Sequence, residues 1–155
     1  MANPDDLAKL ADAFANAHYR VPEFADAGHL HVGSEATALQ DAWPARRYAF
    51  ITAWDSDSER NSRIDNDRAD GALAAELERL GAGHRRAWAE DDQGGHREQG
   101  WLVRDLPFDA LDRLARRFGQ DGVLAWDAGR PVRLRLYHAA PDATAARMPF
   151  VDWVG

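Results

Sequence analysis

The chain has 155 residues and a formal net charge of -7, with 45% hydrophobic and 29% charged residues, as expected for one globular domain. This acidic balance disfavours general nucleic-acid binding, and the lack of cysteine excludes disulfides, thiol nucleophiles and thiolate metal ligands. The N-terminus has no basic region followed by an apolar core, and no apolar run reaches membrane-spanning length, so we expect a cytoplasmic protein without a membrane partner.

Two helices are predicted ahead of the main strands. An apolar stripe over residues 5–19 indicates an amphipathic helix, and residues 29–33 form a short apolar segment after it. Ser34 can then cap a second helix that runs through Ala42. We expect residues 1–45 to form a helical extension that covers the second face of a sheet.

The clearest strand signal follows this extension. Residues 47–54 are rich in β-forming side chains and apolar on both faces, which is typical of a central, covered strand. After a polar stretch, a leucine pattern predicts a helix that ends at Gly81 or Gly83. Residues 84–91 and 99–106 then read as two strands joined by a hairpin around paired glycines.

The remaining elements alternate in the same way. Pro107 suits the first turn of a further amphipathic helix, and Gly119 is placed to stop it. Residues 122–126 predict another strand, and the alternation within residues 131–138 predicts a strand with one wet face. The tail from Pro141 is expected to be loose, although its apolar residues can dock.

This order defines the expected fold class. From residue 47 onward the elements run β-α-β-β-α-β with one added strand, which is the split βαβ, ferredoxin-like order of an α+β protein. We expect a single domain over residues 1–155, with a helical extension at 1–45, an α/β core at 46–138 and a tail at 139–155.

The expected topology places three polar loops at one end of the core. In this order the loops of residues 55–61, 91–98 and 119–122 all connect elements at the same end. The first core helix also begins there, with free N–H groups and a partial positive charge. We therefore expect any functional site to lie at this end.

The polar stretch after the first core strand partly resembles a calcium-binding loop. Asp55, Asp57 and Glu59 stand at alternate positions, as calcium ligands do. Arg60 occupies the place of the required glycine, and Asn66 occupies the place of the bidentate glutamate. We therefore predict a solvated, turn-forming loop and no metal site.

The histidines offer a weaker metal pattern and one acid–base candidate. His29 and His31 share one face of a short strand, but no third zinc ligand stands at a recognisable spacing. His96 lies on the predicted hairpin close to Glu98, and such a pair could carry out acid–base chemistry on a positioned substrate. No phosphate-binding loop or nucleophile motif is present, so we predict no cofactor and assign no catalytic residue.

Two side chains beside these loops have two interpretations each. Gln120 follows a predicted helix, where its amide can either reach a ligand or cap free carbonyl groups. Trp54 opens onto the polar loop and could form the wall of a pocket, although most of the six tryptophans are expected in the core. Arg116 near a helix C-terminus is explained by the helix dipole.

An ordered set of segments resembles the bacterial domain of unknown function 3293 family. These segments are "FITAWDSDS", the asparagine at position 66 ahead of a leucine-rich helix, "EQGWLV" and "LARRFGQDGVLAW", and with "HYRV" the resemblance spans about residues 17–138. The polar positions of the family match Thr52, Trp54, Ser58, Asn66, Glu98 and Gln120. The chain departs from the family pattern at Asp55, Ser56, His96 and Asp121, which puts in doubt any ligand contact made by the missing amides. The resemblance implies no established activity.

These observations favour a small-ligand or nucleotide-binding domain, with its site where the three loops meet. The candidate binding residues are Thr52, Trp54, Ser58, Asn66, His96, Glu98 and Gln120. The alternative is a protein-interaction module of regulatory or immunity type without catalysis, suggested by the acidic surface and the apolar tail. In that case the strand of residues 131–138 is an edge through which a homodimer could form.

A third hypothesis is binding of nucleic acid or an acidic partner through an arginine patch. The residues concerned are Arg85, Arg86, Arg133 and Arg135. The aromatic stacking motif of RNA-binding sheets is absent, so nucleic acid is not the expected partner.

Overall fold

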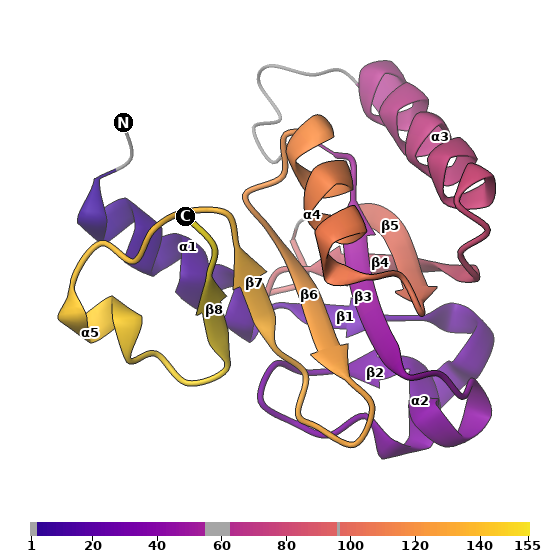
Figure 1. Cartoon of the computed structure of the whole chain (residues 1–155), viewed down its shortest axis with the longest axis horizontal. Coiled ribbons are helices and arrows are strands. Elements are labelled where there is room, and N and C mark those ends of the chain that lie inside the picture. Colours follow the sequence, from indigo (N-terminus) through magenta and orange to yellow (C-terminus); the bar gives the residue numbers. More distant parts are fainter. Residues whose placement is uncertain (1–2, 55–62, 96) are drawn as a thin grey trace.

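The structure, a computed structural model, describes residues 3–54, 63–95 and 97–155 (Figure 1). Its described part contains one eight-stranded sheet with the strand order β2-β1-β4-β5-β3-β6-β7-β8. The strands are β1 (His18–Arg20), β2 (His29–Leu30), β3 (Arg47–Thr52), β4 (His84–Glu90), β5 (Arg97–Arg104), β6 (Gly122–Asp127), β7 (Leu134–Leu136) and β8 (Val151–Trp153). Neighbouring strands are antiparallel except β7 and β8, which are parallel.

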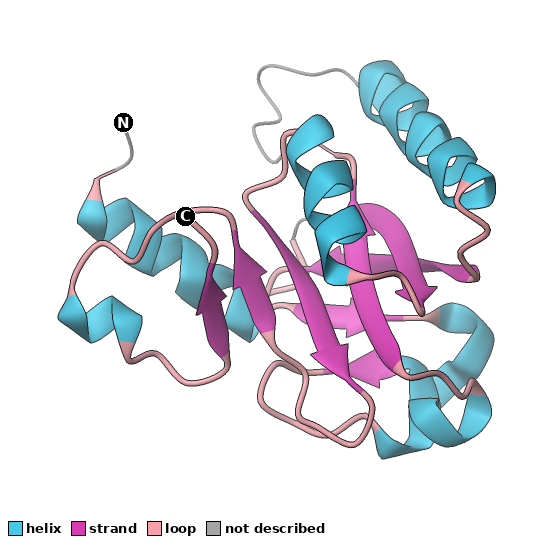
Figure 2. Ribbon diagram, in the orientation of Figure 1, coloured by secondary structure: helices cyan, strands magenta, loops and turns pink. Residues whose placement is uncertain are grey.

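Helices flank this sheet on both faces (Figure 2). They are α1 (Pro4–Asn16), the 3-10 helix η1 (Pro22–Gly28), α2 (Thr37–Ala42), α3 (Arg63–Arg79), α4 (Phe108–Arg117) and α5 (Ala143–Ala146). The mixed α+β class expected from the sequence is thereby confirmed. None of the helices in the described residues is long and apolar enough to cross a membrane.

The two faces of the sheet carry separate apolar cores. On the outer face, Leu73 and Leu77 of α3 and Leu111 of α4 pack against Ile51 and Val103 of the strands. The inner face packs against the N-terminal elements, and its core includes members of α1, β1, β2 and α2 together with strands β3 to β8. Figure 1 shows α4 crossing in front of β3 and β6, with α1 behind β7 and β8.

The sheet also curls toward closure. An isolated bridge joins Val32, just after β2, to Val132, just before β7, and a second bridge joins Glu35 to Pro131. The segments that follow one edge strand are thus brought next to the opposite part of the sheet. The inner face is therefore concave, and residues of the N-terminal segment form part of its core.

The N-terminal segment differs from the prediction in two places. The first helix ends at Asn16, and His18–Arg20 instead forms a strand, because Tyr19 is buried and its hydroxyl donates to the Phe14 carbonyl at 2.6 Å. Ser34 does not cap α2, whose cap position is Ala36 without a side-chain bond. The Ser34 carbonyl instead accepts from the Val132 amide at 2.9 Å.

The apolar residues in and just after α3 are only partly buried. Leu73 and Leu77 are buried, whereas Ile64 is 63% exposed and Leu80, which follows the helix, is 40% exposed. The buried side of α3 includes Asn66 and Asp70, because polar partners replace part of the apolar contact.

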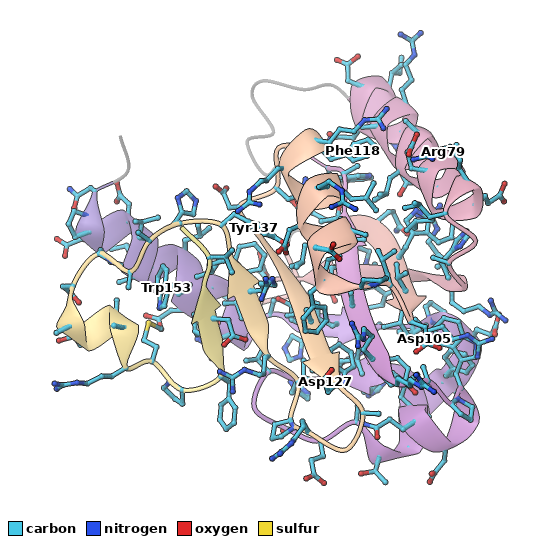
Figure 3. All side chains as sticks on the ribbon, viewed as in Figure 1. Arg79, Asp105, Phe118, Asp127, Tyr137 and Trp153 are labelled. Atoms are coloured by element: carbon cyan, nitrogen blue, oxygen red, sulfur yellow. The ribbon has the colours of Figure 1, made fainter. Side chains whose placement is uncertain are left out.

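The C-terminal tail is also more ordered than expected. It forms α5 and β8, and β8 pairs with β7, so β7 is an internal strand and not an exposed edge. Trp153, labelled in Figure 3, donates its indole N–H to the Ala145 carbonyl at 3.0 Å and ties β8 to α5. Dimerisation through the edge of residues 131–138 therefore loses its structural basis.

Candidate functional site

Two adjoining hollows lie between α1 and the inner face of the sheet. The larger hollow has a volume of about 180 Å³ and mostly apolar walls. Its lining residues are Leu10, Ala13, Phe14, Ala17, Tyr19, Phe50, Thr52, Ala89, Glu90, Asp91, Glu98, Gly122, Val123 and Leu124. The smaller hollow, of about 80 Å³, is lined by Leu10, Phe14, Trp54, Glu98, Gly119, Gln120 and Asp121.

The floor of the larger hollow is made by five strands that are adjacent in the sheet. In sheet order these strands are β1, β4, β5, β3 and β6, which contribute Tyr19, Ala89, Glu98, Phe50 and Leu124 among others. The roof is the C-terminal half of α1. The register places Glu98 opposite Ala89, so the carboxylate belongs to the inner face of the sheet.

Gly122 keeps the space between α1 and β6 open. A methyl group at this position would lie 2.7 Å from Leu136 Cδ2, 3.2 Å from the Arg135 carbonyl oxygen and 3.5 Å from Phe14 Cζ. A side chain at this position would force its neighbours on β7 to shift, so glycine suits the close approach of β6 to α1 and β7.

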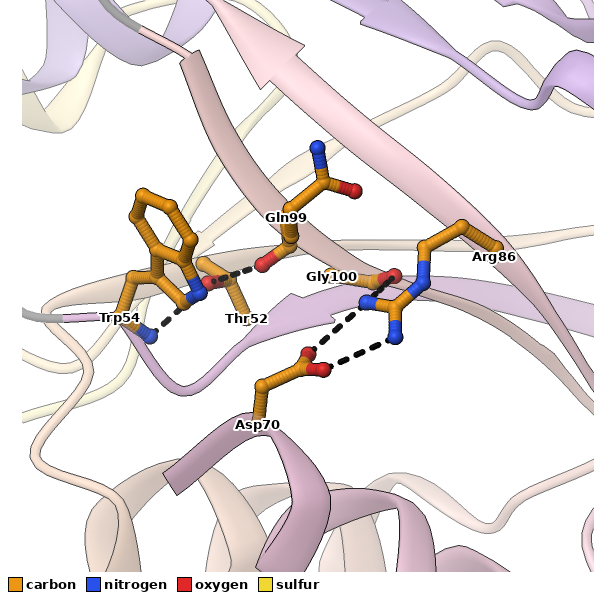
Figure 4. Close-up of polar contacts among 6 residues, drawn as sticks. All are labelled: Thr52, Trp54, Asp70, Arg86, Gln99 and Gly100. Atoms are coloured by element: carbon orange, nitrogen blue, oxygen red, sulfur yellow. Dashed lines mark hydrogen bonds and ion pairs between the residues drawn. The ribbon is translucent and has the colours of Figure 1, made fainter. Parts of the chain in front are cut away.

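Thr52 has a structural function at the end of β3. Its hydroxyl donates to the Gln99 carbonyl at 2.8 Å and accepts from the Trp54 amide at 3.0 Å (Figure 4). This hydroxyl fixes the end of β3 to β5 and sets the direction of the chain at Trp54. Thr52 thus shapes the hollow, and its hydroxyl is engaged by the backbone.

Gln120 joins two of the segments that the topology argument brought together. Its amide nitrogen donates to the Trp54 carbonyl at 3.1 Å and to the Phe118 carbonyl at 3.3 Å. Of its two predicted roles, the capping of free carbonyl groups is therefore the one that the structure displays. Gln120 still lines the smaller hollow beside Glu98.

The charged side chains among the described lining residues are all acidic. Glu90, Asp91, Glu98 and Asp121 line them, and no lysine, arginine or histidine does so among the described residues. The pKa of the Tyr19 hydroxyl is raised above its ordinary value. Burial is the larger cause, and the negative charge of Glu98 is the smaller one.

Three of these carboxylates have described partners. Asp91 accepts the backbone amides of Gln93 and Gly95 at 3.0 and 2.8 Å, within the turn after β4. Glu90 lies 3.5 Å from Arg97, and Asp121 lies 2.9 Å from His138 Nε2. Glu98 also has an interaction of its own, and it borders both hollows.

The structure brings together four of the seven candidate residues. Thr52, Trp54, Glu98 and Gln120 all line the hollows. Asn66 lines neither hollow; it is buried on α3, where it has an interaction of its own. Ser58 and His96 lie outside the described residues, as do Asp55, Asp57 and Glu59 of the calcium-like stretch.

Two histidines lie close to one another, His18 on β1 and His31 just after β2. His18 and His31 meet edge to face with ring centroids 5.8 Å apart. Burial, Arg20 and the two neighbouring histidines lower the pKa of His31. Within residues 3–54, 63–95 and 97–155, no group of three histidine or carboxylate side chains is arranged to hold a metal.

The arginine patch proposed for nucleic-acid binding is engaged in ion pairs. Arg85 pairs with Glu23 at 2.8 Å, Arg86 with Asp70 at 2.9 Å, Arg133 with Asp152 at 2.9 Å and Arg135 with Asp112 at 2.8 Å. Figure 4 shows the bidentate ion pair between Arg86 and Asp70. These guanidinium groups thus serve to join elements of the fold.

Sequence reasoning missed the contribution of α1 to the site. Leu10 and Phe14 border both hollows, and Ala13 and Ala17 line the larger one. The apolar stripe of α1 and its small alanines were visible in the sequence. That stripe, however, does not show which part of the sheet the helix covers.

Comparison with known protein families finds a match in the central part of the chain. Residues 51–123 match the family model "Protein of unknown function (DUF3293)", from the middle of β3 to the start of β6. No curated protein and no solved structure gives a significant match. The match contains the seven candidate binding residues, and over residues 51–123 it confirms the resemblance seen in the sequence segments. Residues 51–123 of the chain are therefore similar to the DUF3293 family of proteins of unknown function.

Proposed function

We propose that this chain is a binding domain for a small molecule with an apolar body, which enters the larger hollow between α1 and the sheet. The observation that carries this proposal is a hollow of about 180 Å³ with mostly apolar walls and a few polar groups among its lining residues. Such a combination is typical of small-molecule sites, and the mouth of a curled sheet is a common place for one.

The chemistry of the walls favours some ligand classes over others. A nucleotide would place its phosphates among Glu90, Asp91, Glu98 and Asp121, with no cationic side chain among the described lining residues. We therefore favour a small non-nucleotide ligand. The volume suits a ligand with a single ring, since apolar cavities of about 150 Å³ bind benzene.

We also infer that residues 46–138 form a ferredoxin-like unit within a single domain of residues 1–155. The antiparallel order β4-β5-β3-β6 supports this inference, as does the packing of α3 and α4 against one face. Tyr19 and Leu30 of the N-terminal extension are buried in the inner core, which supports one domain. A stable, folded fragment that lacks residues 1–45 would contradict the inference that residues 1–155 form a single domain.

Ligand binding is tested by filling the hollow. Ala13 lines the larger hollow from α1, and Ala13→Phe places a ring in that space. Ala75→Phe is the matched control, because Ala75 is exposed on α3, which packs on the opposite face. Ethylbenzene should stabilise the wild-type chain and the control variant, by about 1.4 kcal/mol at a concentration of about ten times Kd.

Thermal unfolding with and without ethylbenzene measures this effect. The proposal predicts that Ala13→Phe loses the ethylbenzene-induced rise in Tm. An equal rise in all three proteins would place binding elsewhere. No rise in the wild-type chain up to the solubility limit would instead favour the interaction-module hypothesis.

A further inference from the structure

We propose that the ligand of these hollows carries a cationic amine, which lies beside Glu98 while its apolar body occupies the larger hollow. This inference rests on the proposed ligand-binding function and adds the charge of the ligand to it. Its basis is a site with mostly apolar walls, in which every charged side chain among the described lining residues is acidic.

The sign of the charge is the first argument. Four carboxylates line the two hollows, and the described lining residues include no cationic side chain. A positive group is attracted to such a site, and the attraction is stronger between apolar walls than in water. These carboxylates would repel an anionic ligand.

The position of Glu98 is the second argument. Among the described carboxylates, Glu98 alone lines both hollows, together with the apolar side chains of Leu10 and Phe14. Glu98 is also half-buried, whereas Asp91 is exposed. A charged hydrogen bond to Glu98 would therefore form in a partly water-excluded place.

The aromatic side chains give the third argument. Phe14, Tyr19 and Phe50 line the larger hollow, and Phe14 and Trp54 line the smaller one. Aromatic rings attract cations through the negative charge of their faces, and rings combined with a carboxylate are a common way to bind ammonium groups. The Tyr19 ring is held in place by its hydrogen bond to the Phe14 carbonyl.

Three ligands of similar shape test the inference on the wild-type chain. Ethylbenzene is neutral, 2-phenylethylamine adds an ammonium group to the same skeleton, and phenylacetate carries a negative charge. We expect 2-phenylethylamine to bind at least about tenfold more tightly than ethylbenzene, as a charged hydrogen bond allows, and phenylacetate to bind most weakly. Isothermal titration calorimetry gives the three Kd values.

Two neutralising variants locate the effect. Glu98→Gln should raise the Kd of 2-phenylethylamine to that of ethylbenzene and leave the Kd of ethylbenzene unchanged. Glu90→Gln is the matched control, because Glu90 lies near Arg97 and lines only the larger hollow. It should change the Kd for the amine by less than about threefold. An amine preference that survives in Glu98→Gln would overturn the assignment to Glu98.

The outcomes separate this inference from the function on which it rests. Equal binding of ethylbenzene and 2-phenylethylamine by the wild-type chain would overturn the charge inference and leave the ligand-binding proposal intact. Failure of both ligands to bind would overturn both. The comparison among the three ligands needs no variant, so it holds even if Glu98→Gln does not fold.

Discussion

The side-chain amide of Gln120 donates to the carbonyl oxygen of Trp54 at 3.1 Å, although the two residues lie 66 positions apart in the chain. This bond joins the turn after α4 to the segment that follows β3. Both residues line the smaller hollow, so the bond fixes one wall of the candidate site.

Removal of this link should loosen the wall and lower stability. Gln120→Ala loses the bonds to the Trp54 and Phe118 carbonyls, and we expect the free energy of unfolding to fall by about 1 kcal/mol. Gln93→Ala is the matched control, since Gln93 is exposed in the turn after β4 and should change stability by less than about 0.5 kcal/mol. Urea denaturation measures both, and equal effects would contradict a structural role for Gln120.

Thr52 offers a test of the link between β3 and β5. Thr52→Val keeps the shape but leaves the Gln99 carbonyl and the Trp54 amide without their partner, at a cost of about 1–3 kcal/mol. Thr52→Ser retains the hydroxyl and should cost less than about 1 kcal/mol, the value of one buried methyl group. If chemical denaturation shows Thr52→Ser to be the more damaging change, packing and not hydrogen bonding governs this position.

Two glycine-to-alanine substitutions should change the free energy of unfolding in opposite directions. A methyl group at Gly100 in β5 would lie 2.6 Å from the Ile51 carbonyl oxygen, so Gly100→Ala should cost about 1–3 kcal/mol through a backbone shift. Gly71 lies in α3 with nothing within 4 Å of such a group, and Gly71→Ala should stabilise the chain by about 0.5–1 kcal/mol. Thermal unfolding distinguishes the two, and a stabilised Gly100→Ala would contradict the tight contact between β3 and β5.

Asp112 should make stability depend on acidic pH. Burial opposes the charged form of Asp112, but hydrogen bonds from Arg135 and Tyr137 outweigh burial and lower the pKa of this carboxyl. Figure 3 labels Tyr137 near α4. A lowered folded-state pKa gives stability that is complete above the unfolded value of about 3.9 and is lost as pH falls through the folded value.

Asp112→Asn should therefore remove part of the acid sensitivity. At neutral pH it should cost about 2–3 kcal/mol, because the charge of Arg135 remains without its partner. Below about pH 4 the stability of the wild-type chain should fall more steeply than that of Asp112→Asn. Asp109→Asn on the exposed side of α4 is the control, and parallel pH curves for wild type and Asp112→Asn would contradict the lowered pKa.

Much of the fold could be predicted because its pattern is local. The central position of β3 follows from residues that are apolar on both faces, and five of its six residues are buried. The position of α4 follows from its apolar spacing and from Gly119, which has a φ of 66° just after the helix. The strand β8 has only three residues, which is too short for a recognisable alternation.

The candidate site could be predicted only in part, for a physical reason. Sequence patterns placed Trp54, Glu98 and Gln120 near one end of the sheet, because the order of elements sets where loops meet. The hydrogen-bond partner of an amide such as Gln120 depends on segments that are distant in the sequence. The apolar stripe of α1 does not show which surface the helix packs against. The roof of the hollows, with Leu10 and Phe14, therefore required the structure.

The central claim is that the hollow between α1 and the sheet binds a small apolar-bodied ligand. Titration of the isotope-labelled chain with ethylbenzene, followed by two-dimensional amide NMR, tests this claim most directly. The claim predicts saturable shifts at Ala13, Ala17 and Gly122, which line the larger hollow, and unchanged signals at Ala72 and Ala75 on α3. Shifts confined to α3, or no saturable shift at the three lining residues, would contradict it.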